Sequence, residues 1–111
     1  MTRPGQLASG TVWFAALARG HEQAGDRPVL VVSSHFHLDL TGGALVTVLP
    51  VTSRYRSGWL HRVQLGDSSW VITEQLRTIA TSRLRRRTPE LDPDRDALTD
   101  VRRVLAAMLD Q

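Results

Sequence analysis

Cysteine and lysine are both absent from this chain of 111 residues. Without cysteine there can be no disulfide and no thiolate metal site, which is compatible with a reducing cytoplasm. All 14 basic residues are arginine, whose planar guanidinium suits two-point contacts with phosphate. The net charge of +3 permits binding to a polyanion without requiring it.

Long apolar runs are missing too, and no stretch is long enough to span a membrane. Residues 3–18 faintly resemble a signal peptide, but Ser9-Gly10-Thr11 interrupts the apolar part and cleavage would delete a predicted strand. We therefore expect a cytoplasmic protein. With 41% apolar residues the chain can build one hydrophobic core but not two. The predicted organisation is a flexible tail over residues 1–9 and a single domain over residues 10–111.

Short apolar runs divided by turn signals predict a mainly β fold, a small twisted antiparallel sheet or SH3-like barrel. The runs expected to form strands are residues 11–17, 29–34, 44–49, 59–65 and 70–79. Pro50 is expected to end the third strand. Between Trp59 and Leu65, apolar and polar side chains alternate, which is typical of a half-buried strand. Residues 35–40 fit either a helical turn or a strand end.

The C-terminal segment changes to a helical period. Asp92 is predicted to cap a helix, with Pro93 at its first position. One face of that helix is apolar and should pack on the sheet; it comprises Ala97, Leu98, Val101, Val104, Leu105, Met108 and Leu109. Within the basic run over residues 83–87, Arg85 to Arg87 are interpreted as a solvated connection and not as a binding site.

The most informative stretch is residues 20–33, a polar loop with two glycines followed by a β-branched apolar run. It places His21, Glu22 and Arg27 within seven residues, at the mouth of a predicted strand. Pro28 disfavours helix at Arg27 and favours an extended backbone there. Functional groups on a loop held by a rigid strand are a common way to build a site.

This stretch, Gly20-His21-Glu22-Gln23-x-Gly25-x-Arg27-Pro28-Val29-Leu30, resembles the signature of the MazF/PemK/Kid toxins. These are the ribonucleases of toxin–antitoxin systems, and they share a small β fold with the gyrase poison CcdB. Three more blocks resemble the family in the right order: Gly10-Thr11-Val12-Trp13, Pro50-Val51-Thr52-Ser53 and Glu74-Gln75-Leu76-Arg77-Thr78-Ile79. The resemblance covers roughly residues 10–84 and a C-terminal helix of the expected kind.

The resemblance implies a sequence-specific endoribonuclease that cuts single-stranded messenger, ribosomal or transfer RNA and so inhibits translation and growth. The ribose 2′-OH attacks the adjacent phosphorus, leaving a 2′,3′-cyclic phosphate and a 5′-OH, with no cofactor or metal. It also implies a homodimer, and a MazE-like antitoxin whose acidic, extended segment blocks the RNA grooves.

That reaction needs a base for the 2′-OH proton, a cation for the phosphoryl oxygens and an acid for the leaving oxygen. Arg27 matches the family's catalytic arginine, and its fork can bind two phosphoryl oxygens. Its alternative role is a salt bridge that pins the loop. Thr52 matches the catalytic threonine and can hold the scissile group in line; the alternative is ordinary turn chemistry. His21 or Glu22 can serve as the base, and Glu22 can instead orient Arg27.

Glu74 lies where Kid-like members carry an acidic residue proposed as the base. Two residues earlier those members have an arginine assigned as the general acid, whereas this chain has Ile72, which cannot donate a proton. The departure favours a scheme built on Arg27 and Thr52.

The remaining candidates are binding residues. Those expected to contact RNA are Ser53, Arg54, Arg56, Gln75 and Arg77, with Gln75 also suited to bracing the sheet. Arg62 is expected to line the same groove. His35 and His37 are interpreted as structural, because no further ligands accompany them.

Two other functions are open to the sequence. A CcdB-like gyrase poison is disfavoured, because that activity in the family needs a C-terminal Trp-Gly pair and this chain ends Met108-Leu109-Asp110-Gln111. A catalytically weak relative that only binds nucleic acid or antitoxin stays open because of Ile72.

Overall fold

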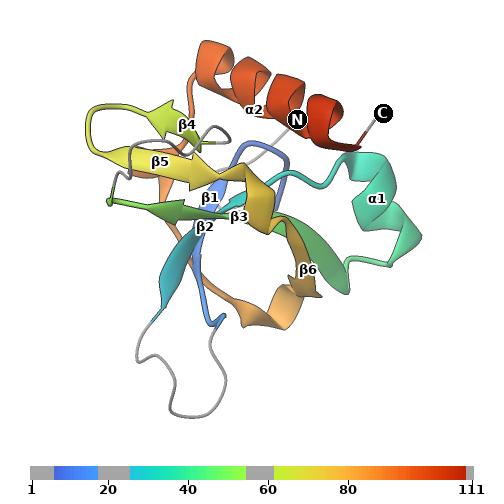
Figure 1. Cartoon of the computed structure of the whole chain (residues 1–111). Coiled ribbons are helices and arrows are strands. Elements are labelled where there is room, and N and C mark those ends of the chain that lie inside the picture. Colours follow the sequence, from blue (N-terminus) through green and yellow to red (C-terminus); the bar gives the residue numbers. More distant parts are fainter. Residues whose placement is uncertain (1–6, 18–25, 55–61, 110–111) are drawn as a thin grey trace.

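A computed structural model of the chain describes residues 7–17, 26–54 and 62–109. Its elements, in chain order, are β1 (Val12–Ala15), β2 (Arg27–Val31), α1 (His35–Leu40), β3 (Leu45–Thr52), β4 (Arg62–Leu65), β5 (Ser69–Ile72), the 3₁₀ turn η1 (Thr73–Gln75), β6 (Arg77–Ala80), η2 (Thr81–Arg83), β7 (Leu84–Arg87), η3 (Pro89–Leu91) and α2 (Arg95–Leu109). The strands pair antiparallel and α2 follows them, which confirms the mainly β fold with a C-terminal helix (Figure 1).

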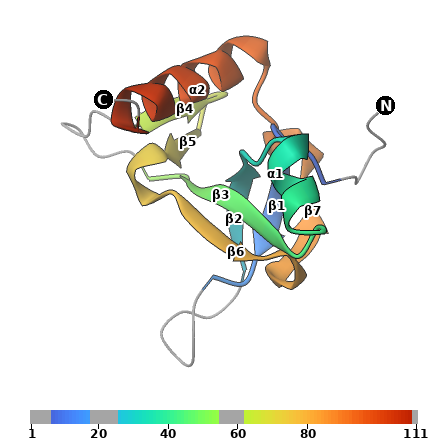
Figure 2. The same ribbon diagram turned by 90° about the vertical axis from the view of Figure 1, so that its right-hand side faces the viewer.

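β3 is the central strand of the sheet. The sheet runs in the order β4-β5-β3-β2-β1-β7, and β6 also pairs with β3. One edge of β3 pairs with β2, while the other pairs with β6 over residues 45–48 and with β5 over residues 51–52. Figure 2 shows β6 following one half of β3, with β5 at its other end. A single strand therefore connects both halves of the molecule.

The expectation that Pro50 ends this strand is wrong, because β3 continues to Thr52. Pro50 lies opposite Val29 of β2, between the residues of β3 that pair with β6 and those that pair with β5. Proline has no N–H to donate, so it is tolerated in a strand where a hydrogen-bond partner is missing. Here the missing N–H lies at the point where the neighbour of β3 changes from β6 to β5.

The single long strand expected over residues 70–79 is also wrong. The chain forms β5 and β6 with η1 between them, and Thr73 of η1 is fully buried. Both strands pair with the same edge of β3, on either side of Pro50. The 3₁₀ turn takes up the extra residues at the point where a continuous strand would face the proline.

Residues 35–40, which the sequence leaves open between helix and strand, form the helix α1. Ser34 caps it, because the side-chain oxygen accepts the backbone N–H of His37 at 3.1 Å. The large side chains of Phe36 and Leu40 are 72% and 68% exposed.

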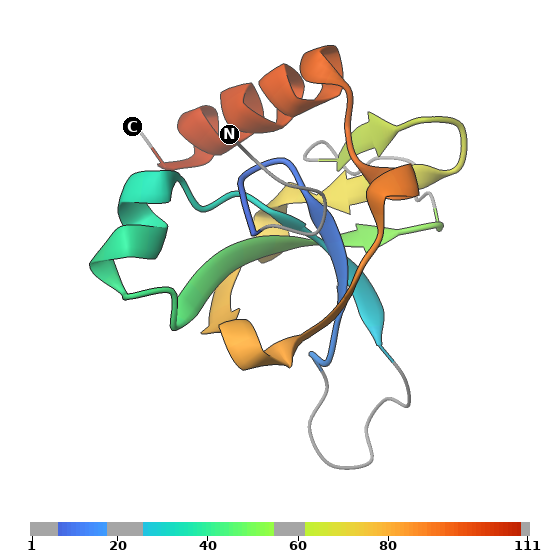
Figure 3. The ribbon, with the colours of Figure 1, turned by 180° about the vertical axis from the view of Figure 1, so that it is seen from behind.

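The basic run is a strand rather than a solvated connection. Its residues 84–87 form β7, which pairs with β1 at the end of the sheet (Figure 3). Arg83 and Arg87 at the two ends of the run bond within the protein, whereas Arg85 and Arg86 between them are exposed, so the sequence has no apolar alternation that would indicate a strand. The packed part of the chain begins before Gly10, because Ala8 is buried.

Asp92 does not cap the C-terminal helix. Asp94 does, by accepting the N–H of Ala97 at 2.8 Å, and α2 begins at Arg95. Asp92 instead accepts the N–H of Val12 at 2.9 Å and two hydrogen bonds from Arg87, at 2.8 and 2.6 Å. The carboxylate therefore ties the segment before α2 to the first strand.

The hydrophobic core has two parts. One contains Val12, Leu30, Leu49, Val51, Val63, Leu65, Val71 and Val101, and is covered by Ala97, Val104 and Leu105 of α2. The other contains Ala15, Val29, Val31, Leu38, Val46, Val48 and Ile79. Alternate residues of β2 and β3 belong to different parts, because successive side chains of a strand point to opposite faces.

We predict that Asp92→Asn lowers the free energy of unfolding by about 1–3 kcal/mol, because it breaks a two-point charged contact that is mostly shielded from water. The matched control is Asp100→Asn, which removes an exposed ion pair to Arg103 and should cost less than about 1 kcal/mol. Urea unfolding measures both. Equal losses would show that the Asp92 contact has no special structural role.

Candidate functional site

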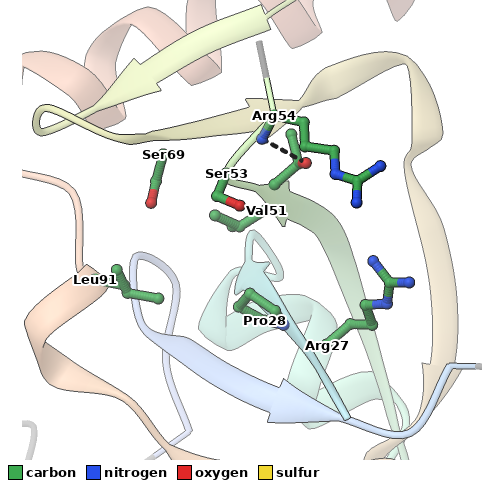
Figure 4. Close-up of a pocket in the computed structure, with 8 residues that line it drawn as sticks. Arg27, Pro28, Val51, Ser53, Arg54, Ser69 and Leu91 are labelled. Carbon is green, nitrogen blue, oxygen red and sulfur yellow. Dashed lines mark hydrogen bonds between the residues drawn. The ribbon is translucent and has the colours of Figure 1, made fainter. Parts of the chain in front are cut away.

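A hollow of about 390 Å³ opens between the start of β2 and the end of β3 (Figure 4). It is lined by Arg27, Pro28, Val51, Thr52, Ser53, Arg54, Ser69 and Leu91. The two residues that the sequence places at the centre of the chemistry, Arg27 and Thr52, therefore line one site, together with the predicted binding residues Ser53 and Arg54.

Strand pairing brings these residues together. Val29 of β2 lies opposite Pro50 of β3, and the strands are antiparallel. Arg27 begins β2 and Thr52 ends β3, each two residues beyond this pair, and both line the hollow. Arg27 is exposed, and Figure 4 shows its side chain and that of Arg54 projecting toward the same space.

Thr52 holds the chain as it leaves β3. Its side-chain oxygen accepts the backbone N–H of Arg54 at 3.1 Å, so the turn chemistry considered for this residue is present. The hydroxyl keeps its own proton as a donor while it accepts that bond. One hydroxyl can therefore fix the turn and still donate into the hollow.

Glu74 does not line this hollow. It lies on η1, and its carboxylate is 3.9 Å from the Nε of Arg62. The Nη1 of Arg62 also donates to the backbone carbonyl of Arg54, at 3.5 Å. The side chain of Arg62 is only 4% exposed, which corrects the expectation that it lines an open groove and contacts phosphate. It connects Glu74 to the turn that carries Arg54.

Gln75 and Arg77 are exposed, on η1 and β6, and neither lines the hollow. Ile72 lies directly opposite Arg62 in the pairing of β5 with β4. His21, Glu22 and Arg56 lie outside the residues that the structure describes.

The sequence missed four lining residues: Pro28, Val51, Ser69 and Leu91. Pro28 and Val51 belong to the motif blocks around Arg27 and Thr52, but the sequence assigns neither of them a place in the site. Ser69 begins β5 after the turn at Gly66, and Leu91 belongs to η3. No motif marks these last two, since they reach the site only through β3–β5 pairing and the path of the chain before α2.

His37 has a structural partner, as the sequence predicts. Its Nδ1 is 2.8 Å from the side-chain oxygen of Ser33, which also accepts the N–H of Thr47 at 2.7 Å. Over the described ranges 7–17, 26–54 and 62–109, no three His, Asp or Glu side chains are grouped so that they could hold a metal ion. No helix in this part of the chain is long and apolar enough to cross a membrane.

Comparison with known proteins agrees with this geometry. The model of the PemK-like, MazF-like toxins of type II toxin–antitoxin systems matches residues 8–109. A chain of the MazE–MazF structure from Deinococcus radiodurans is 30% identical, with a TM-score of 0.72, over 95% of this chain and 97% of that one. MazF from the same organism is 33% identical, with a TM-score of 0.66 and the same coverage.

An endoribonuclease in complex with its cognate antitoxin, from a mycobacterial species, is 18% identical with a TM-score of 0.74, over 94% of this chain and 95% of that one. At this identity the likeness shows the fold alone. No protein among the curated sequences matches. With a family model covering nearly the whole described chain, the protein belongs to the PemK-like, MazF-like toxin family.

Proposed function

We propose that this protein is the toxin of a type II toxin–antitoxin system and acts as a sequence-specific, metal-independent endoribonuclease on single-stranded RNA. The observation that carries the proposal is the shared hollow of Arg27, Thr52 and Arg54 at the β2–β3 junction. It combines two cations with a hydroxyl donor, which are groups that a phosphoryl-transfer site requires.

In this scheme the scissile phosphate enters the hollow. Arg27 binds two phosphoryl oxygens through its fork, where negative charge develops as the ribose 2′-OH attacks phosphorus. Thr52 donates its O–H to the same group and holds it in line. The P–O5′ bond breaks as the 2′,3′-cyclic phosphate forms, and the leaving oxygen takes up a proton. His21 or Glu22 accepts the 2′-OH proton in this proposal.

Two protein partners follow from the same proposal. An antitoxin of the MazE kind would cover the hollow with an acidic, extended segment, for which the exposed arginines supply charge complementarity. Support comes from the similarity to a MazE–MazF structure. The second partner is another copy of the chain. We propose that the two copies contact each other through α1, where the large apolar side chains of Phe36 and Leu40 are exposed. The proposed place of action is the cytoplasm.

The direct test incubates purified, antitoxin-free protein with a long single-stranded RNA in excess EDTA. Discrete cuts that leave 2′,3′-cyclic phosphate and 5′-OH ends are expected, because the 2′-OH is the nucleophile and no metal takes part. The mapped ends also give the recognition sequence. Uncut RNA, followed by uncut total tRNA, at high protein concentration would overturn the nuclease proposal and leave a binding-only relative.

Arg27→Ala should lower kcat/KM for RNA cleavage by about 100-fold or more, since it removes the cation that faces the developing charge. Circular dichroism and the melting temperature should stay close to wild type, because Arg27 is exposed. Arg102→Ala, an equal loss of charge on the exposed side of α2, is the control and should cleave normally. Equal activity of the two variants would contradict the role of Arg27.

Thr52→Val should lower kcat by about 10-fold to 100-fold, because it removes a hydroxyl donor while keeping the shape of the side chain. Thr52→Ser keeps the hydroxyl and should retain most of the activity. A rapid-quench time course with saturating RNA measures both. If serine fails to rescue, Thr52 acts through the packing of its methyl group and not through hydrogen bonding.

We expect sedimentation equilibrium to give twice the monomer mass for the wild type. The double change Phe36→Glu and Leu40→Glu should yield a folded monomer, because it places charges where the second copy would contact α1. Gln64→Glu, on an exposed part of β4, is the control and should stay dimeric. A dimer that survives the double change would place the interface elsewhere.

A further inference from the structure

A row of side chains crosses three strands next to the candidate site. Pro28 of β2 lies opposite Phe14 of β1, and Phe14 lies opposite Arg86 of β7. Residues directly opposite each other in antiparallel strands present their side chains on the same face of the sheet. Because Pro28 also lines the hollow, the row begins at the wall of the hollow and ends at the last strand of the sheet.

Arg86 and Phe14 form a stacked pair at the far end of this row. The guanidinium carbon of Arg86 is 4.5 Å from the centroid of the Phe14 ring, which is the geometry of a cation–π contact. Arg86 is nevertheless exposed. A guanidinium that lies on a ring in this way is already ordered, so stacking a further planar group on it costs less conformational entropy.

The neighbouring arginines differ from Arg86 in what they contact. Arg87 is engaged by Asp92, and Arg83 donates to the carbonyls of Ala16 and Leu17, at 3.1 and 3.4 Å. Arg85 is exposed but has no residue opposite it, because the pairing of β1 with β7 shifts between Phe14 and Ala15. Arg86 is thus the arginine of β7 that lies in the row leading to the hollow.

We propose that the Phe14–Arg86 pair is a stacking subsite for a nucleotide that flanks the cleavage site. The inference rests on the proposed ribonuclease function and extends its substrate contacts beyond the hollow. Two interstrand spacings separate Pro28 from Arg86, roughly 10 Å, which a neighbouring nucleotide of the same RNA strand can span. Proteins hold unpaired bases by stacking them on aromatic rings and on guanidinium planes, with little dependence on base identity.

The subsite should contribute affinity through the base as well as through charge. A base stacks on the outer face of the Arg86 guanidinium, while Phe14 supports the inner face. Arg86→Lys keeps the charge but removes the plane, so it separates stacking from simple attraction to phosphate.

The test compares a minimal RNA oligonucleotide that carries the mapped cleavage sequence with the same core extended by two nucleotides on the 5′ side or on the 3′ side. For the wild type, one extension should raise kcat/KM by about 10-fold, and abasic nucleotides in that extension should remove the gain. Arg86→Ala and Arg86→Lys should both lower the ratio of kcat/KM between extended and minimal substrates toward one. Arg85→Ala, with the same loss of charge on the same strand, should keep the wild-type ratio.

The subsite is overturned if Arg86→Ala and Arg85→Ala give the same ratio, or if Arg86→Ala lowers cleavage of minimal and extended substrates equally. If wild-type protein cleaves no RNA, the proposed ribonuclease function fails on its own, and fluorescence anisotropy with a short single-stranded RNA of mixed sequence and with a form extended by two nucleotides still tests the subsite. Tighter binding of the extended form that depends on Arg86 supports it. Equal binding of both forms, or no binding, refutes it.

Discussion

Backbone pairing between β2 and β3 is the interaction on which the candidate site depends. Each strand contributes buried residues to both parts of the core, so its position is held on both faces. The register that places Val29 opposite Pro50 also places the start of β2 beside the end of β3. A shift of one residue would turn every side chain of β2 to the other face. Core packing and the placement of Arg27 and Thr52 at one hollow are therefore set by the same register.

The structure assigns a supporting position to Glu74. Its partner, Arg62, is buried and also donates to the carbonyl of Arg54, so the carboxylate is linked to the turn that borders the hollow. Ile72 stands opposite Arg62 on the next strand. An arginine is thus present on this face of the sheet even though residue 72 is isoleucine, but it holds a turn and does not face the hollow. This arrangement agrees with a scheme in which Arg27 and Thr52 carry the chemistry.

The chain uses arginine for all its basic positions, and the structure divides them by environment. Arg62 and Arg87 are largely shielded from water and hold turns and the first strand through planar, multi-point contacts. Arg27, Arg54 and Arg86 are exposed on or near the hollow. Lysine could reproduce neither the two parallel hydrogen bonds from Arg87 to Asp92 nor the guanidinium plane that Arg86 lays over Phe14.

By itself, the sequence determined the fold class and the family, and it selected Arg27 and Thr52, two residues that line one hollow. Its signals are local: β-branched runs, turn residues, a helical period in the last segment and motif blocks around Arg27 and Thr52. It also predicted His37 as structural. These features depend on residues that are close together in the sequence, so they can be recognised without the structure.

Only the tertiary structure decided which strands pair with which edge of β3. That pairing let Pro50 stay within a strand, split residues 70–79 into two strands around η1, and turned the basic run into β7. It also brought Ser69 and Leu91 to the hollow, buried Arg62 and moved the helix cap from Asp92 to Asp94. Each outcome depends on contacts between residues distant in sequence. The physical reason is that hydrogen-bond partners and burial are properties of the folded sheet, and no local pattern encodes them.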